Sequence, residues 1–106
     1  MDLRRGLARS LRLIRKVKGI PQDQLSEVSG RTYLSEIERG IKNPTLAKID
    51  ALAKAMNVHP LTLLTITYLA SLREQDVDGL QDRVRKEALG LLEKAEITKP
   101  QKARSR

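Results

Sequence analysis

The sequence predicts an all-α protein, made of a five-helix domain followed by a C-terminal helical extension. Apolar residues recur three and four positions apart along most of the chain, which is the period of a helix with one buried face. Glycines and prolines interrupt this pattern at short intervals, so the helices are expected to be short and closely connected. The core must be aliphatic, because the only aromatic residues among the 106 are two tyrosines.

The first helix is expected over residues 3–18, with Asp2 as its N-cap and Gly19 at its C-terminal end. Its apolar stripe consists of Leu3, Leu7, Leu11 and Ile14. Positions 1–20 hold seven basic residues against one acidic residue, within a net charge of +8 for the chain. This clustering favours a partner that carries phosphate, although a solvated basic face would have the same composition.

Two short helices follow in quick succession, over residues 22–29 and 31–39. Pro21 suits the start of the first, and Gly30 is expected to supply the left-handed backbone at its end. In the second, Leu34 and Ile37 point inward and Gly40 ends the helix. Two short helices joined through a glycine predict a helix-turn-helix, the unit that places its second helix in the DNA major groove.

The outward face of residues 31–39 is polar, with short or forked side chains of the kind that meet base edges. Base contacts are predicted at four positions: Arg31, Thr32, Ser35 and Glu36. Contacts to DNA phosphates are predicted at another four: Gln22, Tyr33, Lys42 and Asn43. Tyr33 has a second interpretation, in which it fills the gap beneath the turn. An ordinary surface helix of mixed charge is the alternative for the whole segment.

Residues 7–64 resemble the lambda-repressor-like, Xre-type helix-turn-helix domain of transcriptional regulators. The resemblance covers a little over half of the chain. It is carried above all by the stretch RTYLSEIERG (residues 31–40) followed by NPTL (residues 43–46), and also by GIPQ (residues 19–22). It implies a five-helix DNA-binding domain, in which an ion pair between Arg15 and Glu38 ties the first helix to the end of the recognition helix.

The chain departs from the family pattern at one place, between Gly30 and Arg31. The family normally has two more residues here, an apolar one that plugs the core and a small polar one that caps the recognition helix. If the turn is truly short, Ser29 is expected to inherit the cap. The interpretation favoured from the sequence is that two residues are missing from it, because losing a plug and a cap would cost about 2–4 kcal/mol.

The second half of the chain predicts three further helices. Residues 46–56 form one that is capped by Thr45, with a buried stripe of Leu46, Ile49, Leu52, Ala53 and Met56. Another starts at Pro60, just after the lone His59, which is interpreted as a local capping or surface residue. This fifth helix is apolar all round, which indicates that a further helix packs on it. After a break at residues 76–79, a sixth helix is expected over residues 80–97.

The domain boundaries expected from these features are 1–66 for the DNA-binding domain, 67–97 for a dimerisation extension and 98–106 for a basic disordered tail. The sixth helix can pack within its own chain or across a dimer. A homodimer is the preferred interpretation, because two symmetric copies read a palindrome. The expected dimer interface consists of Leu69, Leu72, Leu80, Val84, Ala88, Leu91, Leu92 and Ala95.

Together these features predict a cytoplasmic, nucleoid-associated protein that binds double-stranded DNA as a dimer and regulates transcription, most simply as a repressor. An antitoxin-like module with an unknown protein partner and a non-specific nucleoid protein are the alternatives. An enzyme is not expected, because no catalytic motif is present, and neither a cofactor nor a metal site is indicated. No membrane segment is expected, and the absence of cysteine excludes disulfides.

Overall fold

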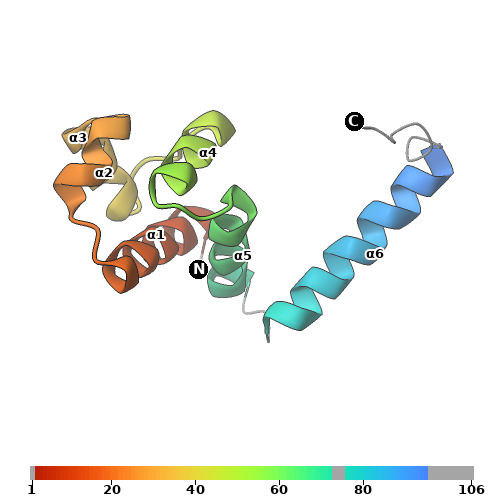
Figure 1. Cartoon of the computed structure of the whole chain (residues 1–106). Coiled ribbons are helices and arrows are strands. Elements are labelled where there is room, and N and C mark those ends of the chain that lie inside the picture. The colour runs from red at the N-terminus through yellow and green to blue at the C-terminus, as the bar shows by residue number, and fades with distance from the viewer. Residues whose placement is uncertain (1, 73–75, 96–106) are drawn as a thin grey trace. The chain divides into compact units, whose positions relative to one another are not determined.

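Six α-helices and no strand are present in residues 2–72 and 76–95, the part of the chain that the computed structural model describes (Figure 1). The predicted all-α class, with five helices followed by a C-terminal helix, is confirmed. The chain divides into two units, residues 1–74 and residues 75–106. The helices are α1 (Leu3–Lys18), α2 (Gln22–Ser29), α3 (Arg31–Glu38), α4 (Leu46–Ala55), α5 (Pro60–Leu72) and α6 (Val77–Ala95).

The expected domain boundary at residue 66 falls inside α5, and α5 belongs as a whole to the first unit. The sixth helix begins at Val77 and not at residue 80, because Asp76 Oδ1 accepts a hydrogen bond from Gly79 N–H at 2.6 Å. An acidic residue at this position caps a helix start, so residues 77–79 form the first turn of α6. The tail expected at residues 98–106 lies outside the described residues.

Capping residues fix the ends of α1 and α4. Asp2 accepts from Arg5 N–H at 2.9 Å, and Thr45 accepts from Lys48 N–H at 3.1 Å. The hydrogen bond from Arg5 N–H lowers the pKa of the Asp2 carboxyl below its usual value, so the charged cap persists to lower pH. At the other end of α1, Gly19 ends the helix as expected, in the left-handed conformation with φ +69° and ψ +33°.

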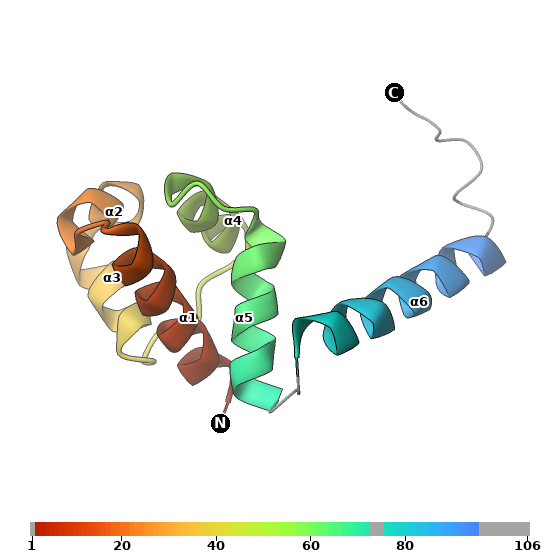
Figure 2. The ribbon, with the colours of Figure 1, turned by 60° about the horizontal axis from the view of Figure 1, so that its bottom comes forward.

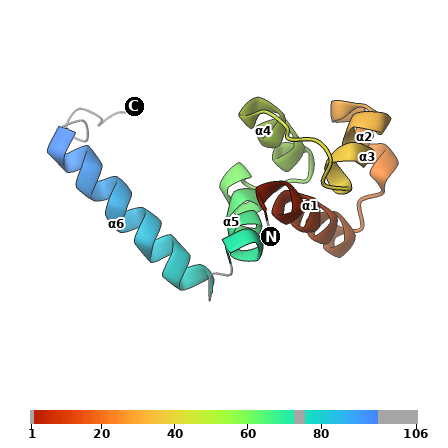
Figure 3. The ribbon, with the colours of Figure 1, turned by 180° about the vertical axis from the view of Figure 1, so that it is seen from behind.

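The core of the first unit lies around α1, which packs against α5 on one side and α3 on the other (Figure 2). The most extensive helix–helix contact is between α1 and α5. Figure 3 shows α4 beside the α2–α3 pair, and α4 also contacts α5. The apolar core is aliphatic, as expected, and consists of Leu7, Leu11, Ile14, Leu25, Leu34, Ile37, Ile49, Leu52, Ala53, Met56 and Leu63.

A close approach of backbones joins α1 to α5. A Cβ atom added at Gly6 would lie 2.7 Å from the backbone oxygen of Thr67 and 3.0 Å from Ser71 Cβ. One turn further along α1, the buried Ser10 and Thr67 hydroxyls share a hydrogen bond of 2.7 Å. The absence of a side chain at Gly6 therefore allows α1 and α5 to pack this closely.

Candidate nucleic-acid interface

A single residue, Gly30, connects α2 to α3. Its φ of +89° and ψ of +146° combine the positive φ that favours glycine with an extended ψ. The expected left-handed helical conformation is therefore wrong, although the requirement for glycine stands. Gly30 N–H donates to Ser26 O at 2.6 Å, and Gly30 O accepts from Leu34 N–H at 3.0 Å. The short turn closes without any inserted residue.

The expected cap of the recognition helix is wrong. Gly30, which has no side chain, occupies the N-cap position of α3, and α3 has no side-chain cap hydrogen bond. Ser29 ends α2, and its Oγ is buried with no hydrogen-bond partner among the described residues. The short turn thus leaves the first-turn N–H groups of α3 without a capping side chain, because Ser29 lies one position too early to reach them.

Glu38 connects three helices at the end of α3. Its carboxylate accepts two hydrogen bonds from Arg15 of α1, from Nε at 2.8 Å and from Nη2 at 3.0 Å. It also accepts from Gln22 Nε2 of α2 at 3.1 Å, and the Glu38 carbonyl accepts from Arg12. The Glu38 side chain is only 5% exposed, so this network holds α1, α2 and α3 at a fixed mutual angle.

The Arg15–Glu38 ion pair has the partners that the family resemblance implied. Gln22 has a role that the sequence did not predict. It was expected to contact a phosphate, yet its amide nitrogen donates to Glu38 and its side chain is half-buried. The sequence carried no signal for this contact, because it depends on how α2 and α3 pack.

The four predicted base contacts lie on the outward side of α3. Arg31 and Thr32 are exposed, whereas Ser35 and Glu36 are half-buried. Leu34 and Ile37, on the opposite side, are fully buried. Arg31 Nη2 lies 3.3 Å from Asp23 Oδ1, and both side chains are more than three-quarters exposed. An ion pair this exposed is weak, so Arg31 remains able to bind another acceptor.

The predicted phosphate contacts fall into two groups. Lys42 and Asn43 are exposed in the loop after α3, and the loop is held by Glu36 O, which accepts from Ile41 N–H at 2.9 Å. Tyr33 is half-buried and packs against the core, with Lys48 Nζ 5.9 Å from the centre of its ring. The position of Tyr33 favours its second interpretation, as the residue that fills the space beneath the turn.

A basic hollow lies next to this interface and was not predicted. It has a volume of about 250 Å³ and is lined by Arg5, Ala8, Arg9, Arg12, Arg39 and Gly40. Three of its arginines lie at spacings of four and three along α1, so a signal for one basic face was present in the sequence. The contribution of Arg39 could not be seen there, because it comes from the end of α3.

The profile of the helix-turn-helix family matches residues 11–63, half of the chain. The chain belongs to this helix-turn-helix family. Regulators of the family bind double-stranded DNA and are generally non-enzymatic, so membership supports a DNA-binding regulator. No solved structure matches the chain.

Three relatives are similar to this chain over part of its length. Control protein C.SmaI of Serratia marcescens is 42% identical over 67 residues, which cover 61% of this chain and 80% of the relative. An uncharacterized HTH-type transcriptional regulator of Sinorhizobium fredii, y4dJ, is 36% identical over 63% of this chain and 90% of its own. Control protein C.BamHI of Bacillus amyloliquefaciens is 40% identical over 42% of this chain and 56% of its own.

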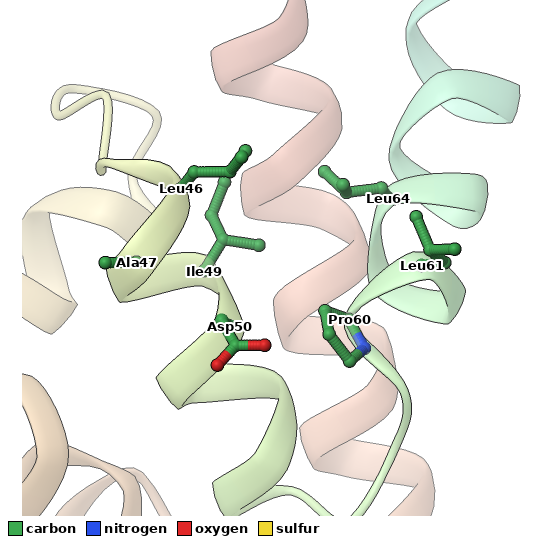
Figure 4. Close-up of a pocket in the computed structure, with 7 residues that line it drawn as sticks. All are labelled: Leu46, Ala47, Ile49, Asp50, Pro60, Leu61 and Leu64. Carbon is green, nitrogen blue, oxygen red and sulfur yellow. The ribbon is translucent and has the colours of Figure 1, made fainter. Parts of the chain in front are cut away.

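Outside the helix-turn-helix, an apolar hollow of about 410 Å³ lies between α4 and the start of α5 (Figure 4). Leu46 and Ile49 border it from α4, and Leu61 and Leu64 border it from α5. Leu46 was expected in the buried stripe of its helix, but it is 73% exposed, because it is the first residue of α4 and lies at the rim. His59 Nδ1 accepts from Leu61 N–H at 3.0 Å and caps α5 locally, as one of its two interpretations held.

The residues expected at a dimer interface are mostly on α6. Within this helix Leu91 is 70% exposed, Val84 50% and Leu92 37%, and Ala88 and Ala95 are also exposed. Leu80 is buried, and Leu69 on α5 is half-buried. The side chain of Leu72 lies outside the described residues. The described part of α6 therefore carries an apolar stripe that is open over most of its length.

Two further features are absent from the described residues. No three side chains of His, Cys, Asp or Glu come together there as metal ligands. None of the described helices combines the length and the apolar character that crossing a bilayer requires.

Proposed function

We propose that this helix-turn-helix protein is a sequence-specific transcriptional regulator, a repressor, that binds a palindromic operator as a homodimer through α3. The observation that supports this most strongly is the two-sided character of α3. Leu34 and Ile37 fix one side in the core, and the network at Glu38 fixes the angle of the helix. The other side presents Arg31 and Thr32 to solvent, as a helix that enters a major groove must.

In this proposal Arg31 reads guanine through its forked guanidinium, and Thr32 contacts a thymine methyl group or a phosphate. Ser35 and Glu36, one turn further along α3, meet the neighbouring bases, with Glu36 accepting from cytosine N4. Lys42 and Asn43 hold a phosphate beside the groove. Gln22 stays with Glu38 and contributes to DNA binding by positioning α3.

The decisive experiment is selection from a pool of random duplexes at near-physiological salt, followed by sequencing. Enrichment of a palindrome with half-sites about one helical turn (~34 Å) apart is expected. Binding without an enriched sequence would replace this proposal with a non-specific nucleoid role. No binding, with co-purification of an unrelated protein, would replace it with the antitoxin-like alternative.

Two of the similar proteins are named control proteins, which favours a narrower version of the same function. In this version the protein controls a restriction–modification operon and acts on its own promoter. The selected operator is then expected upstream of its own gene, beside genes for a methyltransferase and an endonuclease. A selected operator found only at distant promoters would exclude the narrower version and leave the general one intact.

Replacing Arg31 with alanine is expected to weaken operator binding by about 1–3 kcal/mol and to relax the preference at one base position. Lys42→Ala serves as the comparison, because loss of a phosphate contact should weaken binding to all sequences alike. Asp23→Ala tests the ion pair, and should leave the base preference unchanged. Competition binding with single-base operator variants measures all three. Equal weakening on every sequence by the Arg31 variant would contradict its base-reading role.

Introducing a charge into the open stripe of α6 is expected to weaken the homodimer. Leu91→Glu should raise the dimer dissociation constant at least tenfold, because a glutamate that becomes buried loses its hydration. Lys94→Gln changes the net charge by the same one unit on the same helix and is the matched control. Sedimentation equilibrium measures both. If only Leu61→Glu dissociates the dimer, the interface lies at the hollow between α4 and α5 instead.

A further inference from the structure

The basic hollow brings together arginines that have no anionic partner among the described residues. Arg5, Arg9, Arg12 and Arg39 line it, and no acidic residue does. Within residues 2–72 and 76–95, no carboxylate pairs with Arg5, Arg9 or Arg39. The nearby carboxylate of Glu38 is occupied by Arg15 and Gln22. The arginines that line the hollow repel one another, and a bound anion would offset this repulsion.

Contacts between α1, the end of α3 and the loop after it hold the hollow in a fixed shape. Arg12 is half-buried and donates to the Glu38 carbonyl. This hydrogen bond ties the Arg12 side of the hollow to the end of α3. Gly40, with φ +75°, turns the chain so that its Cα passes close to Arg5, whose Cγ would lie 3.7 Å from an added Cβ. Arg4 Nη1 reaches Ile41 O at 3.5 Å and joins the start of α1 to the same loop. The positions of the arginines therefore follow from packing between α1 and the end of α3.

The hollow lies in line with the face of α3 that is proposed to read DNA. Arg39 follows Ser35 and Glu36 by four and three residues, and those follow Thr32 by three and four. Residues at these spacings share one face of a helix. Arg39 adopts φ −95° and ψ +2° at the end of α3, close enough to helical to keep this direction. The base-reading face thus runs directly into the basic hollow.

We propose that this hollow is a second phosphate-binding site, which holds backbone phosphates of the duplex beyond the bases read by α3. The inference rests on the proposed function, since it extends the same DNA interface. Arginine binds phosphate oxygens through paired N–H groups, and phosphate contacts carry no sequence information of their own. The site would therefore add affinity and salt dependence, and would lengthen the bound duplex without changing the sequence that is preferred.

The test compares Arg5→Gln/Arg9→Gln with Lys54→Gln/Lys94→Gln, which removes the same two charges at positions outside the hollow. Binding to one duplex with long flanks, and to one trimmed at the ends of the half-sites, is titrated from about 50 to 200 mM salt. For the arginine variant, the slope of log K against log salt should become shallower by about 1 to 2 for each protomer. Trimming the flanks should weaken wild type and the lysine control, but not the arginine variant.

The ratio of operator affinity to affinity for a scrambled duplex should stay within about twofold in both variants, because neither removes a base contact. Equal slopes for the two variants, or a changed ratio in the arginine variant, would overturn the second site. If wild type shows no sequence preference, the proposed function fails, but the slopes on the scrambled duplex still test the hollow. Failure of wild type to bind any duplex would overturn both. Thermal unfolding of each variant confirms that the fold is retained.

Discussion

Replacing Glu38 with alanine is expected to lower the free energy of unfolding by about 3–5 kcal/mol. The Arg15 side chain is only 15% exposed, and without Glu38 its charge would have no carboxylate partner and little contact with water, with only the Ile20 carbonyl left to accept from it. Gln22 would lose its acceptor at the same time. Since domains are stable by only about 5–15 kcal/mol, this one carboxylate accounts for a large part of the total. Urea unfolding followed by circular dichroism measures the loss.

The control for Glu38 is Asp50→Ala, which removes a carboxylate from the exposed ion pair with Lys54. This change should alter stability by no more than about 0.5 kcal/mol, because both side chains are well hydrated. A double variant, Arg15→Met with Glu38→Leu, should recover most of the stability, since it leaves no buried charge unpaired. If the double variant is as unstable as the single one, the loss of stability comes from packing and not from the unpaired charge of Arg15.

The second large effect is expected at Gly6. Gly6→Val should lower the free energy of unfolding by about 3 kcal/mol, at the upper end for overpacked sites. Its Cβ would lie 2.7 Å from a backbone oxygen of α5, which cannot move aside as a flexible side chain would. The strain falls on the most extensive helix–helix contact of the domain, between α1 and α5. The melting temperature should fall by roughly 4–8 °C for each kcal/mol.

Gly90 in α6 provides the matched control, because nothing lies within 4 Å of a Cβ added there. Gly90→Ala should be neutral or stabilising by up to about 1 kcal/mol, as alanine favours a helix more than glycine does. Gly6→Ala should fall between the two, with its gain in helix propensity partly offsetting the clash. Equal melting temperatures for the valine variant and wild type would show that α1 and α5 can separate freely.

Features that depend on local sequence were predicted well. The bounds of α1, its Asp2 cap and its Gly19 end are as expected, because each depends on residues within one turn of the helix end. The inward positions of Leu34 and Ile37 followed from their spacing alone. The partners Arg15 and Glu38 came from the family resemblance, since nothing in their separation of 23 residues indicates a contact.

Features that depend on exact helix starts, on the backbone of one turn residue or on tertiary packing were missed or wrong. The exposed position of Leu46 and the start of α6 at Val77 depend on where each helix begins, which periodicity does not determine. The failure of Ser29 to cap α3 depends on the ψ of one glycine. The basic hollow forms only because Arg39 lies beside α1. The hydrogen bond from Gln22 to Glu38 forms only because α2 and α3 meet at a particular angle.

The shortness of α2 and α3 limits how this protein can be engineered. Each has eight residues, below the roughly 12–15 that an isolated helix needs to be even marginally stable in water. Both depend on α1 and α4, through Glu38 and the shared core, for their conformation. Residues 22–38 cannot therefore be grafted onto another scaffold as a self-contained cassette. The smallest transferable unit includes α1 to α5, and new specificities are better introduced by changing single side chains on the face of α3.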